Sequence, residues 1–163
     1  MKAYYNLIDK IHTYLDGNPN VNTVTFGDIM DVDLSKQIIF PLVHVTVSNV
    51  TFSEAVMNIS FNVAAMDVVD EDKDDKQDKS EPHLGLDNKQ DILNTQLTVI
   101  NGLQSSLRRG ELYDDHYQLN QDANAKLFQD RYENLLTGWT LSMTIQIPNN
   151  DMGLINRDGS QCN

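Results

Sequence analysis

Residues 139–148 read WTLSMTIQIP, and this stretch carries the clearest secondary-structure pattern in the chain. Apolar and polar residues alternate strictly along it, with apolar side chains at Trp139, Leu141, Met143, Ile145 and Ile147. Successive side chains of a β-strand point to opposite faces of the sheet, so strict alternation predicts a strand with one buried face. Pro148 has no N–H to donate and is expected to end this strand.

Two earlier segments show the same alternation and lie close together in the chain. Residues 43–47 alternate with valine on the odd positions, whereas the next apolar residues fall on even positions. A bulge or turn near Asn49 would account for this change of phase. Residues 57–63 alternate again, and TFSEAV at 51–56 is short enough for a tight connection. The pattern predicts an antiparallel hairpin.

Two other segments have apolar residues at the spacing of a buried helix face. The first covers residues 4–15 and is followed by Gly17, a residue type common at helix C-terminal caps. The second covers residues 92–107, has a broader apolar face, and is followed by Gly110. Gly102 lies inside this helix, where glycine costs about 1 kcal/mol relative to alanine. It therefore predicts a close backbone approach at that point.

Three segments give weaker signals. Residues 21–34 look like a strand with a ragged end, and LYDDHYQL at 112–119 looks like a short strand. Residues 123–136, ANAKLFQDRYENLL, fit either a helical turn or an irregular strand. The order of elements predicts an α+β fold, in which a single mostly antiparallel sheet packs against an N-terminal helix and a long central helix.

The chain length of 163 residues favours one domain. We expect a single α+β domain over residues 1–152, an acidic loop insert within it at about 70–88, and a C-terminal tail at 153–163. The polar faces of the predicted strands carry Thr, Ser and Asn rather than charged residues. Such a face can lie against another subunit without burying charge, although simple exposure to solvent is the commoner outcome.

The formal net charge of -12 disfavours a nucleic-acid-binding surface or an anionic membrane as partner, because both require clustered Lys and Arg. The single cysteine, Cys162, allows no intramolecular disulfide and fits a reducing compartment. The N-terminal residues contain no unbroken apolar region of a signal peptide, and no apolar run approaches the ~20 residues of a membrane span. These features predict a soluble protein of the cytoplasm, or one assembled there.

The stretch 67–81, DVVDEDKDDKQDKSE, contains eight acidic residues and raises the question of a metal site. Read as a calcium-binding EF-hand loop, it places acidic residues at the ligand positions of Asp70, Asp72, Asp74, Asp78 and Glu81. The sixth position requires glycine for a sharp turn, but Asp75 stands there, and a predicted strand precedes the segment in place of a helix. We expect a solvated acidic loop, with calcium binding as the alternative.

A magnesium-dependent nuclease is a second alternative. Glu71 and Lys73 form an acid-x-Lys pair after a strand, and a further carboxylate such as Glu54 or Asp67 would have to join them. An acidic loop would repel the polyanionic substrate of such an enzyme. Zinc-ligand spacing, a phosphate-binding glycine loop and a nucleophile elbow are all missing from the sequence. We therefore expect no enzyme activity, no catalytic residues and no cofactor.

Two arginines at the end of the second helix are followed by a densely polar segment, GELYDD. Their charge suits the last turn of a helix through its dipole, so the simplest interpretation is a capped helix end. The alternative is a clasp between subunits, in which arginine makes bidentate bonds to carboxylates of a neighbour. The candidate interface residues are Arg108, Arg109, Glu111, Tyr113, Asp114 and Asp115.

Six segments together resemble a known family. They read NTVTFGDI, IIFPLVHV, MDVVDEDK, LRRGELYDDHYQL, DRYENLLTGW and IQIPNND, and the resemblance runs from about residue 4 to residue 152. In order and spacing they are similar to small virion proteins of tailed phages that infect Bacteroidetes, including the crAss-like group. Members of this family are described as tail-terminator-like, neck or ring proteins. None of the six segments is a catalytic signature.

The resemblance implies a non-enzymatic virion protein with a tail-terminator-like α+β fold, assembled in the host cytoplasm. It implies a subunit of a homo-oligomeric ring in the neck or tail, between portal or connector proteins and the distal tail. The number of subunits does not carry over from the family; we expect twelve-fold symmetry, with six-fold symmetry as the alternative. Genomic DNA would pass such a ring without specific binding, because carboxylates repel phosphates. The insert between Lys73 and Asn88 departs from the family pattern, and it could equally face outward or toward a stacked ring.

Overall fold

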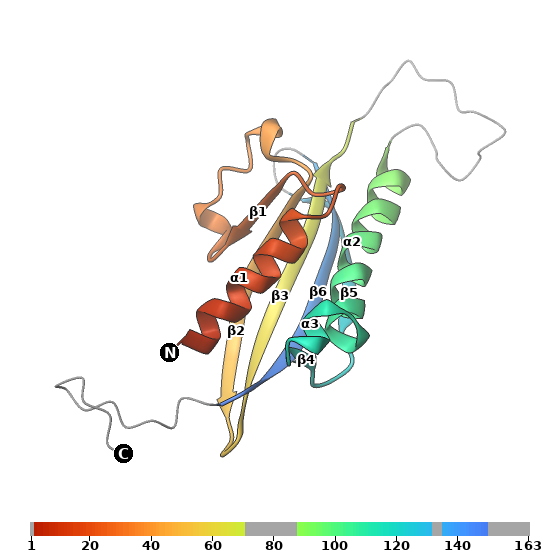
Figure 1. Cartoon of the computed structure of the whole chain (residues 1–163). Coiled ribbons are helices and arrows are strands. Elements are labelled where there is room, and N and C mark those ends of the chain that lie inside the picture. Colours follow the sequence, from red (N-terminus) through yellow and green to blue (C-terminus); the bar gives the residue numbers. More distant parts are fainter. Residues whose placement is uncertain (1, 71–87, 132–134, 150–163) are drawn as a thin grey trace.

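The computed structural model describes residues 2–70, 88–131 and 135–149, and its fold is α+β (Figure 1). Two short 3₁₀ turns, Ile29–Asp31 and Gln37–Ile39, separate the first two strands. The helices and strands are α1 Lys2–Asp16, β1 Thr23–Phe26, β2 Leu42–Phe52, β3 Val56–Val68, α2 Lys89–Arg109, α3 Glu111–Asp114, β4 Gln118–Leu119, β5 Asn124–Arg131 and β6 Leu136–Pro148.

The strands form one six-stranded sheet in the order β1-β2-β3-β6-β4, with β5 also paired to β6. β3 and β6 pair antiparallel from Val56↔Pro148 to Val68↔Leu136, so they form the centre of the sheet. The β2–β3 pair is the predicted antiparallel hairpin, and its register shifts between Val47 and Asn49, which confirms the predicted bulge. Among the described strands, only β1, which runs parallel to β2, departs from the antiparallel arrangement.

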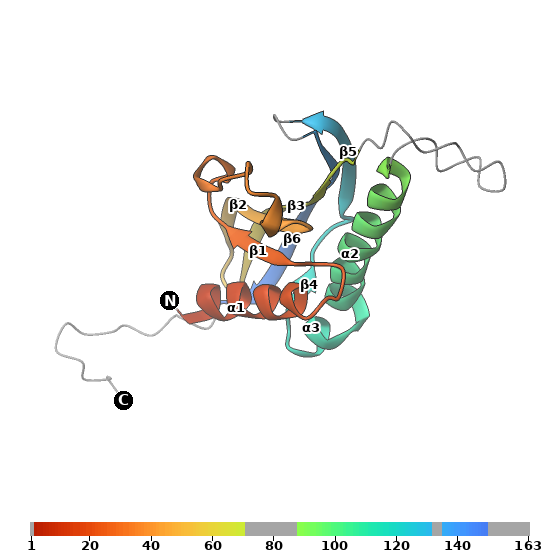
Figure 2. The same cartoon turned by 90° about the horizontal axis from the view of Figure 1, so that it is seen from above.

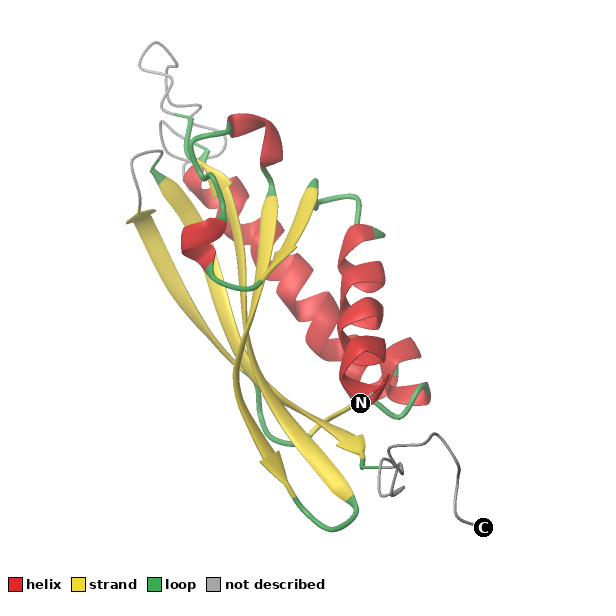
Figure 3. Cartoon of the chain, turned by 90° about the vertical axis from the view of Figure 1, so that its left-hand side faces the viewer, coloured by secondary structure: helices red, strands yellow, loops and turns green. Residues whose placement is uncertain are grey.

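The main core lies between the sheet and the two long helices, which cover the same face of it (Figure 3). α1 contributes Leu7, Ile11 and Leu15, which are spaced at one helical face and are completely buried. The odd-numbered apolar residues of β3 and β6 face these helices, as their alternation predicted. Burial of a side chain of this size contributes about 1.5–3 kcal/mol, so this layer supplies most of the hydrophobic stabilisation.

A buried amide interrupts the apolar face of α2. Gln96 is completely buried, and neither its Nε2 nor its Oε1 has a hydrogen-bond partner among the described residues. One helical turn in either direction, the same face carries Ile92 and Ile100, both of them buried. Gln96 therefore occupies a position that the packing of α2 reserves for an apolar side chain.

A second, smaller core lies on the opposite face of the sheet. Leu42, Met66, Phe128 and Leu136 are buried there, beneath the segment that carries the two 3₁₀ turns. Five apolar side chains of that segment cover this cluster: Ile29, Val32, Leu34, Ile39 and Phe40. The sequence patterns did not predict this layer.

Several of the sequence predictions are confirmed in detail. Helix α1 ends at Asp16 next to Gly17, whose N–H bonds to the Thr13 carbonyl at 3.1 Å. Helix α2 ends at Arg109 next to Gly110, whose N–H bonds to the Ser106 carbonyl at 3.0 Å. A Cβ at Gly102 would lie 3.1 Å from the Tyr14 hydroxyl, so the expected close approach exists, although the neighbour is a side chain.

The predicted strand at 112–119 is confirmed only at its last two residues. Residues Glu111–Asp114 form the helical turn α3, and only Gln118–Leu119 pair with β6. The hydroxyl of Ser106 accepts a hydrogen bond from the Leu112 N–H at 3.3 Å, and this contact continues the helical path past Gly110. The turn buries Leu112 against the core, which outweighs the weak alternation of the segment.

The two remaining weak segments are strands, but shorter than the sequence suggested. β1 contains only Thr23–Phe26, and Asp28 then caps a 3₁₀ turn by accepting the Met30 N–H at 3.0 Å. The ambiguous segment forms β5, whose pairing with β6 shifts register between Phe128 and Arg131. None of the described helices is both long enough and apolar enough to cross a membrane.

Candidate functional site

Arg108, the first residue of the candidate clasp, has its partners within the chain. Its Nε donates to Gln104 Oε1 at 2.9 Å, one helical turn earlier, and its Nη2 lies 3.0 Å from Asp122 Oδ1. Asp122 precedes β5, so this ion pair connects the end of α2 to the connection between β4 and β5. Both partners are exposed, and such a pair contributes well under about 1 kcal/mol.

Asp115, at the other end of the clasp, also has an internal partner. Its Oδ2 lies 2.6 Å from Lys10 Nζ on α1, and this carboxylate raises the pKa of Lys10. The guanidinium of Arg109 has no hydrogen bond or ion pair within the described part of the chain, and the same holds for the carboxylates of Glu111 and Asp114. Arg109 is thus the arginine of the clasp that is available to a neighbour.

Only the first residue of the candidate calcium loop is described. Asp70 is exposed, lies two residues after the end of β3, and donates its N–H to Asn88 Oδ1 at 2.8 Å. Asn88 Nδ2 also approaches the Val68 carbonyl at 3.4 Å, so this one side chain joins the two ends of the acidic insert. The other four candidate ligands lie outside the described residues: Asp72, Asp74, Asp78 and Glu81. Within the described residues, no group of three His, Cys, Asp or Glu side chains could hold a metal ion.

The carboxylates proposed for a nuclease site are far apart. Glu54 lies in the connection between β2 and β3, whereas Asp67 lies near the other end of β3. At about 3.3 Å per residue, the strand separates them by about 40 Å. Burial raises the pKa of Asp67, and its Oδ1 accepts the Val68 N–H at 2.8 Å. Glu71 and Lys73 lie outside the described residues.

The sheet face opposite the helices carries hydroxyl and amide groups that bond to one another across the strands. Ser142 donates to Asn62 Oδ1 at 2.8 Å, and Ser60 and Thr144 share a hydrogen bond of 3.0 Å. Both pairs join β3 to β6, whose central residues are paired in register. These bonds satisfy the polar groups locally, so the face could be covered without burying charge.

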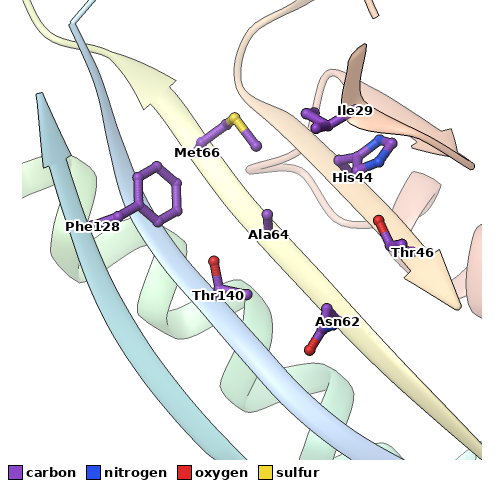
Figure 4. A pocket seen from close by; sticks show the side chains of 8 residues that line it. All are labelled: Ile29, His44, Thr46, Asn62, Ala64, Met66, Phe128 and Thr140. Carbon is purple, nitrogen blue, oxygen red and sulfur yellow. The ribbon is translucent and has the colours of Figure 1, made fainter. Parts of the chain in front are cut away.

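A cavity of about 140 Å³ lies on this face beside the second core (Figure 4). His44 lines it from β2 and is almost fully buried, with Nδ1 2.8 Å from the Thr25 hydroxyl and Nε2 3.1 Å from the Gly27 carbonyl. Since a carbonyl can only accept, Nε2 carries the proton and Nδ1 accepts from Thr25. Burial lowers the pKa of His44, which keeps the ring neutral. Both nitrogens have protein partners, so the ring is a structural element of the cavity wall.

A larger groove of about 670 Å³ lies between the N-terminal half of α1 and the edge of the sheet. Its apolar lining consists mainly of Tyr4, Tyr5 and Ile8 from α1, Phe26 from β1, and Val45 and Val47 from β2. Tyr5 is 69% exposed, although an aromatic side chain of this size is usually buried. The groove is several times larger than the cavity beside the second core.

The groove runs beside an open edge of β2. β1 pairs only with Leu42–Val45, after which Gly27, at φ 111°, turns the chain away from the sheet. A backbone with this φ strongly favours glycine. No described strand pairs with Thr46–Phe52 on the side away from β3, and this stretch contains neither a charged residue nor proline. Natural edge strands usually carry such residues, or a bulge, to prevent pairing with another chain, and this stretch of β2 has the bulge after Val47 but not the residues.

The opposite edge of the sheet, formed by β4 and β5, has a different apolar surface. β5 and β4 pair with β6 alone among the described strands, so their outer edges are open as well. Leu97 of α2 and Leu127 of β5 are 43% and 45% exposed there. A hollow of about 260 Å³ lies between α2 and the start of β5. Figures 1 and 2 show β2 and β5 on opposite sides of the molecule.

Sequence reasoning located the polar strand faces and the clasp residues but missed the groove and both open edges. Gly27 directly after β1 was the available signal, since it marks where the pairing with β2 ends. A comparison with protein-family models and with curated proteins found no match to this chain.

Proposed function

We propose that the chain is a non-enzymatic structural subunit of a homo-oligomeric ring in the neck or tail of a tailed phage. The observation that carries the proposal is the pair of unlike open edges on opposite sides of the sheet. One edge combines the free half of β2 with the apolar groove beside α1, and the other combines β5 with exposed leucines. The resemblance of the six sequence segments supplies the phage context.

Unlike edges are what a closed ring requires. In a head-to-tail ring, each subunit presents one surface to the next copy and a different, complementary surface to the previous one. A subunit whose two sides carried the same patch would favour a two-fold dimer. Here the groove side is lined by aromatic and β-branched residues, whereas the β5 side presents Leu97 and Leu127. Burial of these side chains between copies would contribute the association free energy.

The charge of the chain fits a channel for DNA that is passed on rather than held. A ring of subunits with a net charge of -12 each repels phosphates, so the genome would slide through without specific binding. Twelve-fold symmetry is favoured over six-fold, and the ring would lie between portal or connector proteins and the distal tail, after assembly in the host cytoplasm. Calcium binding by the acidic insert, and a magnesium-dependent nuclease, are the alternatives.

The phage assignment is tested by the composition of purified particles. Quantitative mass spectrometry should find this chain in them at a fixed copy number relative to the portal protein, with a value that matches one ring per particle. Absence of the chain from purified particles would rule out a virion role. Incubation of the purified chain with DNA and Mg²⁺ checks the enzyme alternative, and we expect no cleavage above background.

A further inference from the structure

The open half of β2 and the groove beside it together form a site for an extended apolar segment. The Val45 carbonyl accepts the Gly27 N–H at 3.2 Å, so Val45 directs its backbone groups outward, toward β1. Backbone groups alternate sides along a strand, and Val47 therefore directs its N–H and carbonyl to the same open side. Val47 also lines the groove with its side chain. A strand added here would gain main-chain hydrogen bonds and an apolar pocket together.

We propose that the occupant of this site is the C-terminal segment, residues 150–163, of the adjacent copy in the ring. The inference rests on the proposed ring, because it takes the groove side of one subunit to face the β5 and β6 side of the next. It identifies the partner of the groove, which the proposed function leaves open.

The position of the end of β6 favours the adjacent copy over the same subunit. Pro148 pairs with Val56 at the hairpin end of the sheet, and the Asn149 N–H bonds to the Ala55 carbonyl at 2.9 Å. Within one subunit, the end of β6 lies beside β3, and β2 follows on the far side of β3. The open edge of β2 therefore lies two strands away from the end of β6. On the side away from β3, the described strands β4 and β5 leave Ile147 and Pro148 without a partner. The segment thus begins on the side that would face the next copy.

The length and pattern of the segment suit the site. An extended chain as long as residues 150–163 reaches about 45 Å. From the hairpin end of β2 at Phe52 back to Val47 is about 17 Å along the strand. The segment begins NDMGLIN, in which Met152 and Leu154 fall on alternate positions and would share one face of a strand. Asn150 and Asp151 precede these positions, and both residue types favour the reversal that would bring the chain back along β2.

A photo-crosslink from the groove tests the assignment directly. Tyr5, which lines the groove and is exposed, is replaced by p-benzoylphenylalanine in the full chain, and this protein is mixed with ¹⁵N-labelled wild type before assembly and irradiation. The expected product joins the unlabelled peptide containing position 5 to a labelled peptide from residues 150–163. The same probe at Tyr113, which is also exposed but lies in α3, is the control and should not capture this segment.

Matched substitutions test the same contact energetically. Met152→Asp with Leu154→Asp should raise the dissociation constant of the assembly at least about tenfold. Asn156→Asp with Ser160→Asp adds the same charge to the same segment and should change it less than about twofold. Circular dichroism checks that every variant keeps its fold.

The outcomes separate this inference from the proposed function. A ring in which position 5 crosslinks only within its own subunit, or only to peptides outside 150–163, overturns the inference and leaves the ring intact. Equal effects of the two double substitutions overturn it in the same way. A full chain that never assembles overturns the ring and the inference together.

Discussion

Gly138 of β6 and Ala65 of β3 approach each other so closely that no side chain fits between them. A Cβ built on Gly138 would overlap the Ala65 carbonyl oxygen and would lie 2.9 Å from the Met66 Cα. Both neighbours are backbone atoms of the central strand, so they cannot move aside as the end of a flexible side chain could. The contact lies within the long β3–β6 pair on which both cores rest.

We therefore expect Gly138→Ala to destabilise the fold by about 2–4 kcal/mol, because β3 and β6 would have to separate locally. Urea unfolding followed by circular dichroism measures the change. Gly102→Ala is the matched control. Its Cβ would meet only the hydroxyl at the end of the Tyr14 side chain, and alanine has a higher helix propensity than glycine, so the effect should stay within about 1 kcal/mol. Equal effects of the two substitutions would contradict this account of Gly138.

Gln96 offers a prediction of opposite sign. Its buried amide has no hydrogen-bond partner within the described residues, so Gln96→Leu should stabilise the fold by about 1–2 kcal/mol. Gln104 on the same helix is the control, because its amide bonds to Asn101 and Ser105 and accepts from Arg108. Gln104→Leu should give no such gain. Thermal unfolding of both variants decides, and a loss of stability for Gln96→Leu would show that the amide has a partner.

The pH dependence of the free energy of unfolding should reveal the lowered pKa of His44. Burial lowers its pKa in the folded state, so the unfolded chain binds the proton more readily. The stability that neutral His44 provides is complete above its ordinary pKa of about 6.5, and it is lost as the pH falls below that value. Urea midpoints of wild type and His44→Gln should therefore converge between pH 7.5 and pH 5. Asp67, whose raised pKa changes stability with pH in the opposite direction, is present in both proteins, so its contribution cancels in the comparison. A difference that stays constant with pH would contradict this role.

The hairpin, its bulge, both long helices and the final strand could be predicted because each buries one face, and burial of one face imposes a period on the sequence. The segment 27–41 has no such period, since its apolar residues lie in turns, so the second core beneath it could not be predicted. At 112–119 the weak alternation predicted a strand, but the hydrogen bond to the Ser106 hydroxyl and the burial of Leu112 favour a helical turn over its first residues.

The candidate site was predictable only in part. Arginines at the end of α2 follow from helix chemistry, but which one is free depends on contacts far apart in sequence. Arg108 reaches Asp122 across the turn α3, and Asp115 reaches Lys10 on the first helix. The groove arises because β1 is short, and strand length at a sheet edge depends on tertiary packing more than on local pattern.

Arg109 is consequently the better target for testing the clasp. Arg109→Ala should weaken assembly about tenfold while the monomer stays folded, because its guanidinium has no ion pair within the described residues of its own subunit. Arg108→Ala removes only an exposed internal pair and should have a smaller effect on assembly. Sedimentation velocity over a concentration series measures both. If assembly is unchanged by Arg109→Ala, the clasp between subunits is wrong.

The central claim is that the chain acts by self-association, and electron microscopy of the purified full chain at high concentration tests it most directly. The account predicts closed rings of one cyclic symmetry, in which the groove side of each copy faces the β5 side of the next. Particles that remain single subunits at every concentration, or that pair only through a two-fold axis, would contradict it.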